Sequence, residues 1–379
     1  MIDRPTYIEK LELACRRSPV TALLGPRQCG KTTLARMFTA GKQATRFDLE
    51  SQPDMRRLQN PEWILGGLKG LVVLDEIQEM PELFPVLRVL VDRPDNQTRF
   101  LILGSASPAI IRNVSESLAG RVELIELGGF TLSEIGSNQW QKLWARGGFP
   151  RAFLAETEAD SLAWREGFIQ TFLTRDIPQL GINIPSPAMR RFWTMIAHYH
   201  GQTWNASEIS RSMGVSDKTV RSYLDILTAT FMLRQLQPWF VNLGKRQVKS
   251  PKIYFRDSGL LHNLLGIYDW DGLLGHPKAG ASWEGFALEQ VIQTVCPADV
   301  YFWGVHSGAE VDLLFHQRGK RYGVEFKFSE APKVSPSFYT ALHDLSLEHL
   351  WIVYPGTQVY AVDEKISVAP LQDLSRLLL

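Results

Sequence analysis

The first third of the chain alternates short apolar runs with segments whose apolar residues recur at helical spacing. Near-continuous apolar runs of this length are typical of buried strands in a parallel sheet. Four strands are predicted at TALLG (21–25), LVVLDE (71–76), RFLILGS (99–105) and RVELIEL (121–127). Helices are predicted at KTTLARMFTA (31–40) and ELFPVLRVLVDR (82–93). Strands and helices in this order predict an α/β fold with crossover helices.

Beyond these strands the pattern becomes mainly helical. GGFPRAF (147–153) is typical of a loop, and the helical pattern continues from there to about Trp239. A Gly-rich stretch, GLLGHPKAGAS (272–282), predicts a linker, and another helix is expected from about Trp283. We therefore expect three parts, which cover residues 1–150, 151–270 and 271–379.

The composition is that of a globular protein, with 45% hydrophobic and 21% charged residues. The net charge is +1, so a nucleic-acid surface has to come from local clusters of basic residues. Cys15, Cys29 and Cys296 are scattered and odd in number, which favours a reducing compartment. No apolar run approaches the roughly 20 residues that cross a bilayer, and residues 1–18 lack a signal-peptide pattern. We expect a cytoplasmic protein without a membrane partner.

A phosphate-binding loop is predicted at GPRQCGKT, which matches G-x-x-x-x-G-K-[ST] between an expected strand and an expected helix. The glycines let backbone N–H groups face phosphate oxygens, and the helix adds the positive end of its dipole. Lys31 is expected to reach the β- and γ-phosphates of ATP, and Thr32 to bind Mg²⁺. The residues expected to hold the nucleotide are Gly25, Pro26, Arg27, Gln28, Cys29, Gly30, Lys31, Thr32 and Thr33.

Polar residues close two further strands. Asp75, at the end of LVVLDE, is expected to hold the magnesium ion, and Glu76 to orient and deprotonate the attacking water. Ser105 closes RFLILGS, and a polar side chain at that position can contact the γ-phosphate or the water. The sequence therefore predicts that ATP is hydrolysed at this edge of the sheet.

Arg121 lies just before the strand RVELIEL. An arginine at this position suits a finger that points into the nucleotide of a neighbouring subunit and stabilises the transition state, which implies a homo-oligomer. The simpler alternative is a surface ion pair. Arg112 and Arg175 are rival candidates for the role of the finger.

The segment 204–239 has the pattern of a helix-turn-helix. Ser207 is expected to cap a short helix that runs through Gly214, and Ser216 to cap a second helix. The buried stripe of the second helix is expected to consist of Val220, Tyr223, Leu224 and Leu227. Its exposed front would present Lys218, Thr219, Arg221 and Ser222 to DNA.

The strands LRQLQPWF and PKIYF would form a wing after the second helix. A basic run without acids lies between Gly244 and Arg256, and such a run suits contact with DNA phosphates. Its basic residues are Lys245, Arg246, Lys249, Lys252 and Arg256. The alternative is a winged helix that only packs domains together or forms a subunit interface.

The segment EVDLLFHQRGKRYGVEFKF (310–328) predicts a hairpin with its turn at Arg318-Gly319. In such a hairpin the numbers of two residues that lie opposite each other add up to 637. Asp312 then faces Glu325, and Glu310 faces Lys327, on a charged face opposite an apolar one. Like charges directly opposite each other are unfavourable in a sheet, but a divalent cation such as Mg²⁺ between them reverses the sign. Lys327 could then stabilise a phosphorane-like transition state. The alternative is a solvated sheet face with a Glu310–Lys327 ion pair.

Several motifs together resemble a widespread group of prokaryotic AAA-type ATPases. They are, in chain order, GPRQCGKTTL, LVVLDEIQ, LILGSAS, ESLAGRV, GGFP and FRDSGLL. The resemblance covers nearly the whole chain. It implies an α/β fold with a P-loop AAA+ core and a parallel sheet, a helical and winged-helix middle, and a restriction-endonuclease-like α/β domain at the C-terminal end.

The arrangement D–x(12)–E–x–K of the hairpin resembles the PD-(D/E)XK nuclease superfamily. The resemblance implies that Asp312, Glu325 and Lys327 are catalytic and that an acid from the preceding helix joins the metal site. Glu284 is the first candidate for that acid and Glu289 the second. In this chain the aspartate follows Glu310-Val311 and not proline, and such domains also occur as binding modules without cleavage.

Three functions fit these patterns. The first is an ATP- and Mg²⁺-dependent enzyme that remodels DNA and cuts it. The second is an ATPase that binds DNA structures, including branched ones, without nuclease chemistry. The third is a nucleotide-dependent switch that acts on a protein partner in signalling or defence. The sequence favours an ATPase that acts on DNA.

Overall fold

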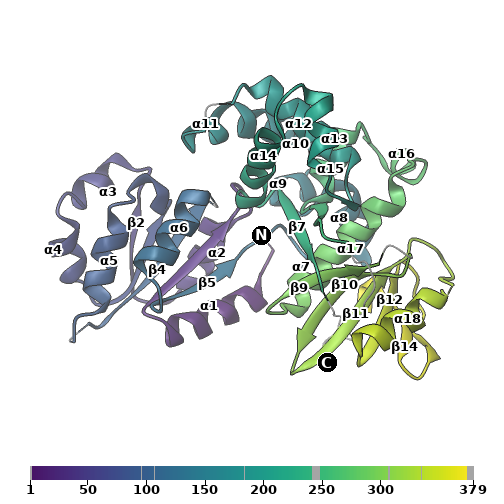
Figure 1. Ribbon diagram of the computed structural model, residues 1–379. Helices are drawn as coiled ribbons and strands as arrows, with labels where there is room; N and C mark the ends of the chain where they lie inside the picture. The colour runs from purple at the N-terminus through teal and green to yellow at the C-terminus, as the bar shows by residue number, and fades with distance from the viewer. Residues whose placement is uncertain are drawn as a thin grey trace. The chain divides into compact units, whose positions relative to one another are not determined.

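The computed structural model describes residues 2–94, 96–105, 107–182, 184–240, 248–305, 308–333 and 335–373. The chain forms two compact units, one of residues 1–129 with 229–231 and one of residues 130–228 with 232–379. Figure 1 shows a parallel sheet with flanking helices in the first unit, and a second sheet with many helices in the other.

The first unit is built on five parallel strands in the order β2-β3-β4-β1-β5. The strands are β1 (Val20–Gly25), β2 (Ala44–Asp48), β3 (Gly70–Asp75), β4 (Thr98–Ser105) and β5 (Val122–Glu126). The helices are α1 (Pro5–Arg17), α2 (Lys31–Thr39), α3 (Gln52–Arg57), α4 (Pro61–Gly66), α5 (Leu83–Val91) and α6 (Pro108–Ser117), with a 3-10 turn η1 (Ile77–Glu79). The four predicted strands and both predicted helices of this unit are confirmed. The edge strand β2 escaped prediction because only one of its residues is fully buried.

The core of the first unit lies between the sheet and its helices. Apolar residues of β1, β3 and β4 and the buried face of α5 belong to one continuous cluster. Strands buried on both faces explain the unbroken apolar runs of the sequence. Because all five strands are parallel, the residues that follow β1, β3 and β4 meet at one edge of the sheet, which is where β-strand carboxyl ends place ligands in α/β folds.

The second unit contains a nine-stranded sheet in the order β13-β14-β12-β11-β10-β9-β7-β8-β6. Its strands are β6 (Gln202–Thr203), β7 (Leu233–Pro238), β8 (Lys252–Phe255), β9 (Val300–Gly304), β10 (Glu310–Gln317), β11 (Lys320–Phe326), β12 (His349–Tyr354), β13 (Tyr360–Asp363) and β14 (Ile366–Pro370). Parallel pairing of β7 with β9 joins the predicted wing strands to the C-terminal hairpin. The middle and C-terminal parts of the chain therefore share one sheet.

The second unit is also rich in helices. The longer ones are α8 (Trp140–Arg146), α10 (Glu158–Thr171), α12 (Ser186–His198), α13 (Ala206–Met213), α14 (Asp217–Ala229), α15 (Ser258–Leu265), α17 (Ala279–Val295) and α18 (Pro336–Leu345). Short helices and turns are α7 (Leu132–Ile135), η2 (Ser137–Gln139), α9 (Pro150–Phe153), a π-helical turn η3 (Phe172–Asp176), α11 (Ile177–Gln179) and α16 (Trp270–Leu274). None of the helices in the described part of the chain has the length and apolar character that a membrane crossing requires.

Two predictions about loops are wrong. The segment 147–153 contains α9, which begins at Pro150, a residue suited to the first turn of a helix. The expected linker at 272–282 is helical at both ends, in α16 and α17. Trp270 explains the second error, because its ring packs edge-on against Trp140 and Trp144 and fixes the segment to the core.

The motif FRDSGLL has a structural role that links it to GGFP. Asp257 accepts hydrogen bonds from the backbone N–H of Gly148 at 2.7 Å and, as the N-cap of α15, from Leu260 at 2.9 Å. A Cβ atom on Gly259 would lie 2.1 Å from the carbonyl oxygen of Arg146. Two motifs that are distant in the sequence are thus one packed contact in the second unit.

Candidate functional site

The phosphate loop connects β1 to α2 in the first unit. Gln28 and Gly30 have positive φ angles of 62° and 100°, which turn the backbone of the loop back on itself. A Cβ atom on Gly25 would lie 2.2 Å from the carbonyl oxygen of Leu127, so only glycine fits at the start of the loop. Lys31 is buried and donates from Nζ to the carbonyl oxygens of Gly25 at 3.1 Å and Pro26 at 2.9 Å. The ammonium group is therefore held at the mouth of the loop.

The other nucleotide residues predicted from the sequence surround this lysine. Cys29 is buried, and its carbonyl oxygen accepts a hydrogen bond from Arg4 at 3.4 Å. Arg27 donates to Glu50 at 3.3 Å. Thr32 and Thr33 follow Lys31 in the first turn of α2. The sequence in this region is thus folded as a loop whose backbone leads directly into a helix N-terminus.

Asp75 closes β3, the second strand from β1 in the sheet. Its side chain is buried; Oδ2 accepts from Nη2 of Arg46 on β2 at 2.6 Å, and Oδ1 has no hydrogen-bond partner among the described residues. A buried carboxylate oxygen without a partner is unfavourable unless a cation or donor completes it. Asp75 therefore fits the metal-binding role expected for it, together with Thr32.

Glu76 and Ser105 are linked by a residue that sequence analysis missed. Glu76 has a left-handed backbone with φ 56° and accepts a hydrogen bond from Nε2 of Gln78. The amide oxygen of Gln78 accepts from the backbone N–H of Ser105 at 3.3 Å. Ser105 pairs with Gly25 in the sheet, and its buried hydroxyl has no partner among the described residues. The sequence signal for this residue was its position two residues after Glu76. The turn η1 directs the side chain of Gln78 toward Ser105 at the end of β4.

Arg121 is at the opposite edge of the same sheet. It precedes Val122, which pairs with Val20 at the start of β1, so the length of β1, about 17 Å at 3.3 Å per residue, separates it from the phosphate loop. Its guanidinium makes a bidentate pair with Asp92, with distances of 2.7 and 2.8 Å, and this hydrogen bonding raises the pKa of Arg121. Arg121 and Asp92 line a surface hollow of about 660 Å³ with Arg88 and Arg93. This arginine cannot reach the nucleotide of its own chain.

The rival arginines lie elsewhere. Arg112 is exposed on α6 in the first unit. Arg175 belongs to the second unit, where its Nε donates to Asp176 at 3.0 Å. The choice among the three arginines stays open.

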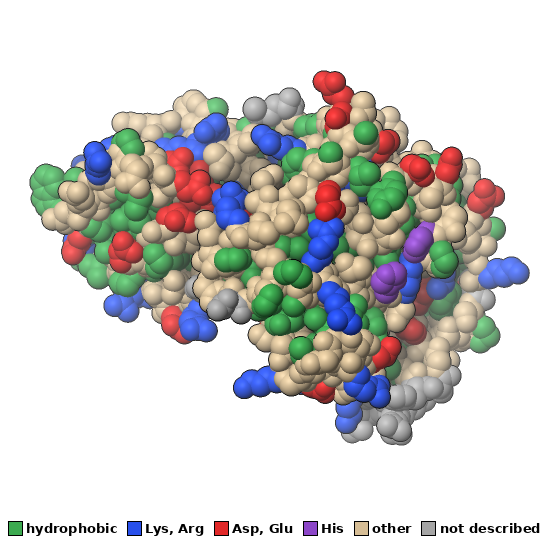
Figure 2. Space-filling view, turned by 90° about the horizontal axis from the view of Figure 1, so that it is seen from above, with side chains coloured by type: hydrophobic (Ala, Val, Ile, Leu, Met, Phe, Trp, Pro, Cys, Tyr) green, Lys and Arg blue, Asp and Glu red, His purple; other side chains and the backbone are tan. Residues whose placement is uncertain are grey.

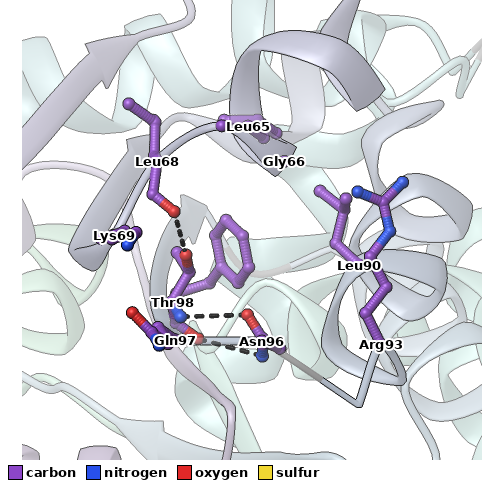
Figure 3. Close-up of a pocket in the computed structure, with 11 residues that line it drawn as sticks. Leu65, Gly66, Leu68, Lys69, Leu90, Arg93, Asn96, Gln97 and Thr98 are labelled. Carbon is purple, nitrogen blue, oxygen red and sulfur yellow. Dashed lines mark hydrogen bonds between the residues drawn. The ribbon is translucent and has the colours of Figure 1, made fainter.

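Figure 3 shows a second cavity in the first unit, of about 190 Å³, at the amino-terminal edge of β3 and β4. Thr98 donates from Oγ1 to the carbonyl oxygen of Leu68 and from its backbone N–H to Asn96 at 3.0 Å. The hydroxyl and the backbone N–H of Thr98, in the wall of this cavity, therefore have partners within the protein. The cavity lies at the end of the strands away from the phosphate loop, and it has no part in the candidate nucleotide site.

The helix-turn-helix segment is folded as α13, a left-handed Gly214 and α14. The predicted buried stripe of α14 is confirmed, as is the cap by Ser216, whose oxygen accepts from the backbone N–H of Thr219 at 3.1 Å. The cap predicted for Ser207 is wrong: α13 begins after Asn205, and the Ser207 hydroxyl donates to Asp217 at 2.8 Å. β6, β8 and β7 form an antiparallel sheet beside these helices.

The residues proposed for DNA contact differ in exposure. Lys218, Arg221 and Lys249 are exposed, and Thr219 is half-buried. Lys245 and Arg246 lie outside the described residues. Figure 2 shows one face of the molecule, on which basic, acidic and apolar side chains are interspersed and no single basic patch dominates.

Two members of the expected basic run are not available to phosphates. Lys252 is buried among carboxylates, and Arg256 forms an ion pair with Glu289 at 3.6 Å. Glu289 is almost fully buried and also makes a bidentate pair with Arg234 of β7. Glu289, the second candidate for a metal ligand, is instead the centre of an ion-pair network.

The predicted hairpin register is confirmed over residues 313–324. In place of the expected Glu310–Lys327 pair, Lys327 pairs with Glu325 and Glu310 pairs with Lys252. β10 and β11 pair from Leu313 with Val324 to Gln317 with Lys320, and Arg318 and Gly319 form the turn with φ angles of 48° and 77°. Both central turn residues with positive φ are typical of a type I′ hairpin. The solvated charged face expected as an alternative is wrong, because Asp312 and Glu325 are 6% and 3% exposed.

The structure brings together the four residues expected from the nuclease resemblance. Asp312 lies where the register of β10 against β9 shifts, between Val311 and Leu314, and it accepts from the backbone N–H of Phe326 at 3.1 Å. Glu284 enters from α17 and accepts from the hydroxyl of Tyr254. Lys327 donates to Glu325 at 2.9 Å. The name acidic cluster is used below for the carboxylates Glu284, Glu310, Asp312 and Glu325 together with Lys327.

A buried lysine lies within the acidic cluster. Nζ of Lys252 is 3.4 Å from Oε1 of Glu284 and 3.3 Å from Oδ1 of Asp312, and it also pairs with Glu310. Among the described residues, no group of three His, Cys, Asp or Glu side chains is arranged to hold a metal ion. Because Lys252 contacts oxygens of Glu284 and Asp312, and Lys327 contacts one of Glu325, these carboxylates do not fit a divalent cation in this arrangement.

Burial dominates the protonation of these groups. It raises the pKa of Glu284 to about 7, with the Asp312 charge acting in the same direction, and raises the pKa of Glu325 well above its ordinary value. Burial alone would lower the pKa of Lys252, but the carboxylates around it raise that pKa well above its ordinary value. Lys252 is therefore the fixed positive charge of the cluster.

Comparison with known proteins gives three consecutive matches. An AAA domain matches residues 17–136, a domain of unknown function (DUF8612) matches 137–271, and another (DUF4143) matches 279–374. The chain is similar to the Walker-type ATPase PABY2304 of Pyrococcus abyssi, with TM-score 0.51, 14% identity, and coverage of 70% of this chain and 96% of that one. At that identity the likeness concerns the fold alone.

Two sequence relatives match almost the entire chain. They are the uncharacterized proteins Rv2008c of Mycobacterium tuberculosis and Mb2031c of Mycobacterium bovis. Each is 50% identical over 374 residues, which cover 99% of this chain and 85% of the relative. The chain therefore belongs to the same family as these mycobacterial proteins, a family of P-loop ATPases in which an AAA domain precedes two domains of unknown function.

Proposed function

We propose that the first unit binds ATP with Mg²⁺ at the phosphate loop and hydrolyses it, and that this turnover serves DNA bound by the second unit. One observation carries the ATPase part of the proposal. The mouth of the loop holds the Lys31 ammonium, and the ends of β3 and β4 hold two buried oxygens, Oδ1 of Asp75 and Oγ of Ser105, that have no partner among the described residues. Polar atoms left in this state at the ligand edge of an α/β sheet indicate a polar ligand.

Each residue has a distinct task in this proposal. Backbone N–H groups of the loop and of the first turn of α2 bind the phosphates. Lys31 exchanges its two carbonyl partners for phosphate oxygens, since both carbonyls belong to the same loop. Asp75 and Thr32 would hold Mg²⁺, which when bound neutralises phosphate charge.

Glu76 accepts the proton of the attacking water in this proposal. Gln78 fixes the carboxylate of Glu76 and at the same time the backbone of Ser105. The groups that contact the water and the γ-phosphate are therefore held in position by the protein. Because Arg121 lies at the far edge of the sheet, it would act only on the nucleotide of a neighbouring copy. The proposal therefore includes a homo-oligomer.

The exposed face of α14 supports the DNA part of the proposal. Lys218 and Arg221 extend from its first turns, while the opposite stripe of the helix is buried. A short helix, a left-handed glycine and a second helix with an exposed basic front match the geometry that places a helix in the major groove. Lys249 adds an exposed charge next to β8.

The ATPase part is tested with purified full-length variants. Glu76→Gln keeps the shape of the side chain but removes its basicity, so it should bind a fluorescent ATP analogue normally and lose at least 100-fold in turnover. Lys31→Ala should lose binding as well. Lys69→Ala, an exposed lysine at the other edge of the sheet, is the control. Full ATP turnover by Lys31→Ala would refute the proposed site.

The DNA part is tested by fluorescence anisotropy with linear, forked and four-way DNAs at several salt concentrations. Lys218→Ala with Arg221→Ala should lower affinity at least 10-fold and flatten the salt dependence, because two phosphate contacts are lost. If neither binding nor any effect of DNA on ATP turnover is seen, the chain is instead a nucleotide-dependent switch for a protein partner.

A further inference from the structure

The acidic cluster contains its own cation. Lys252 begins β8, 60 residues before Asp312, and its side chain is 9% exposed. The ammonium group contacts one oxygen each of Glu284, Glu310 and Asp312, with distances of 3.4 Å to Glu284 and 3.3 Å to Asp312. Three carboxylates from α17 and β10 thus converge on one nitrogen.

The carboxylates also accept hydrogen bonds from other protein donors. The hydroxyl of Tyr254, also on β8, donates to the same oxygen of Glu284 that faces the lysine. The second oxygen of Asp312 accepts from the backbone N–H of Phe326. Glu325 accepts from Lys327. Both oxygens of Asp312 and one oxygen each of Glu284, Glu310 and Glu325 thus have protein donors, whereas a divalent cation requires free oxygen ligands.

Charge and space lead to the same conclusion. A divalent cation bound to Glu284 and Asp312 would lie within a few ångströms of a buried ammonium group, where like charges repel strongly. Residues 252–255 are all buried, and the backbone of Lys252 is paired on both sides, with Leu236 of β7 and Thr203 of β6. A metal ion bound to these oxygens would have to displace the ammonium group.

We propose that Lys252 is a built-in counter-ion that takes the place of the divalent cation, so that the second unit keeps a nuclease-like acidic cluster without binding Mg²⁺ there. The ammonium group offsets part of the charge of the carboxylates and ties β8 to β10 and α17. This proposal does not depend on ATP binding, and it predicts that any DNA cleavage by this chain does not use the acidic cluster.

The test measures Mn²⁺ binding by full-length protein without nucleotide, using the electron paramagnetic resonance signal of free Mn²⁺. Wild type and Asp312→Asn should bind Mn²⁺ equally, because the cluster of the wild type takes none. Lys252→Met keeps the approximate length of the side chain and removes its charge. This variant should gain one Mn²⁺ site per chain, with an affinity at least 10-fold higher than any affinity of the wild-type cluster for Mn²⁺. Adding Asp312→Asn to Lys252→Met should abolish that site.

The controls keep the proposal falsifiable. Lys252→Arg retains the charge and should bind no additional Mn²⁺. If wild type binds a Mn²⁺ that Asp312→Asn loses, the proposal is wrong, and this comparison needs no variant of Lys252. A folded Lys252→Met that gains no Mn²⁺ site also overturns it. If Lys252→Met does not fold, Lys252→Gln replaces it, and the wild-type comparison still decides.

Discussion

Arg46 donates to one carboxylate oxygen of Asp75 at 2.6 Å, and the other oxygen of Asp75 has no partner among the described residues. The arginine is on β2 and partly exposed, whereas Asp75 is buried on β3. One oxygen of this carboxylate is thus paired within the protein, and the other oxygen is available to a ligand.

Arg46→Ala should lower the stability of the nucleotide-free protein by about 1–3 kcal/mol, because a buried carboxylate loses its charged partner. Mg²⁺ with ATP should then raise the melting temperature of the variant more than that of wild type, since the cation replaces the lost charge. Differential scanning fluorimetry with and without MgATP measures both effects. Arg36→Ala, an exposed arginine on α2, is the control. Equal ligand-induced shifts in the two proteins would argue against Asp75 as a metal ligand.

Gln78→Ala should lower the kcat of ATP hydrolysis about 10- to 100-fold and change KM less than 2-fold. The reason is that Gln78 positions Glu76 and Ser105 without being placed to bind the nucleotide. Steady-state kinetics separates the two constants. Gln78→Ala combined with Glu76→Gln should be no slower than Glu76→Gln alone, because residues that act as one unit are not additive. A further loss in the double variant would contradict this role.

Arg121→Ala should reduce ATP turnover about 10³-fold if the arginine acts on a neighbouring copy, as arginine fingers do. Turnover per chain of the wild type should rise with protein concentration, and that of the variant should not. Asp92→Ala removes only the bidentate partner of Arg121 and should retain turnover. An Arg121→Ala protein with full turnover at every concentration would leave the surface ion pair as the whole function of this residue.

Glu289→Ala should destabilise the second unit by about 3–5 kcal/mol, because it removes a buried carboxylate from two largely buried guanidinium groups. Urea denaturation followed by circular dichroism gives the change in the free energy of unfolding. Glu348→Ala breaks the exposed pair with Lys320 and should leave that free energy almost unchanged. Similar effects of the two substitutions would mean that the Glu289 network is not a structural centre.

The stability of the second unit should fall as the pH decreases below 6.5. Burial lowers the pKa of His262 to about 3, so the folded state keeps this ring neutral while the unfolded chain binds a proton near pH 6.5. The contacts agree with a neutral ring: one nitrogen lies 3.0 Å from the carbonyl oxygen of Ala145, and the other 2.7 Å from the hydroxyl of Ser282, which accepts from Trp144.

His262 alone should contribute about 1.3 kcal/mol to the loss of stability between pH 7.5 and pH 5.5. His200, whose pKa burial also lowers to about 3, acts in the same direction. Urea denaturation at the two pH values measures the loss. His262→Gln removes one titrating group, so the difference between the two pH values should shrink. An unchanged difference would show that His262 is not neutral in the folded state or does not titrate in the unfolded one.

Local sequence determined the phosphate loop and the hairpin. A glycine-rich turn between a buried strand and a helix is specified within eight residues, Gly25–Thr32, because backbone geometry and helix N-terminus are local properties. Arg318 and Gly319 likewise fix the register of β10 and β11 through their own left-handed conformations. Opposite positions in a hairpin follow by counting, so Asp312 and Glu325 could be placed together from the sequence.

Side chains that arrive from distant elements could not be predicted in this way. Lys252 lies in a basic stretch of sequence, and only the joining of β7 to β9 in one sheet brings it to Glu284 and Asp312. Gln78 and Arg46 meet Glu76 and Asp75 for the same reason, through a turn and a neighbouring strand.

The sequence by itself thus determined the type of each chemical group and the local backbone that carries it. Only the tertiary structure decided which charges face one another. The physical reason is that the sign and strength of an electrostatic interaction depend on distance and burial, and both are set by strand pairings between residues far apart in the chain. The acidic cluster illustrates this: its carboxylates suggest a metal ion from the sequence, and a single buried lysine makes it a closed ion-pair network in the folded chain.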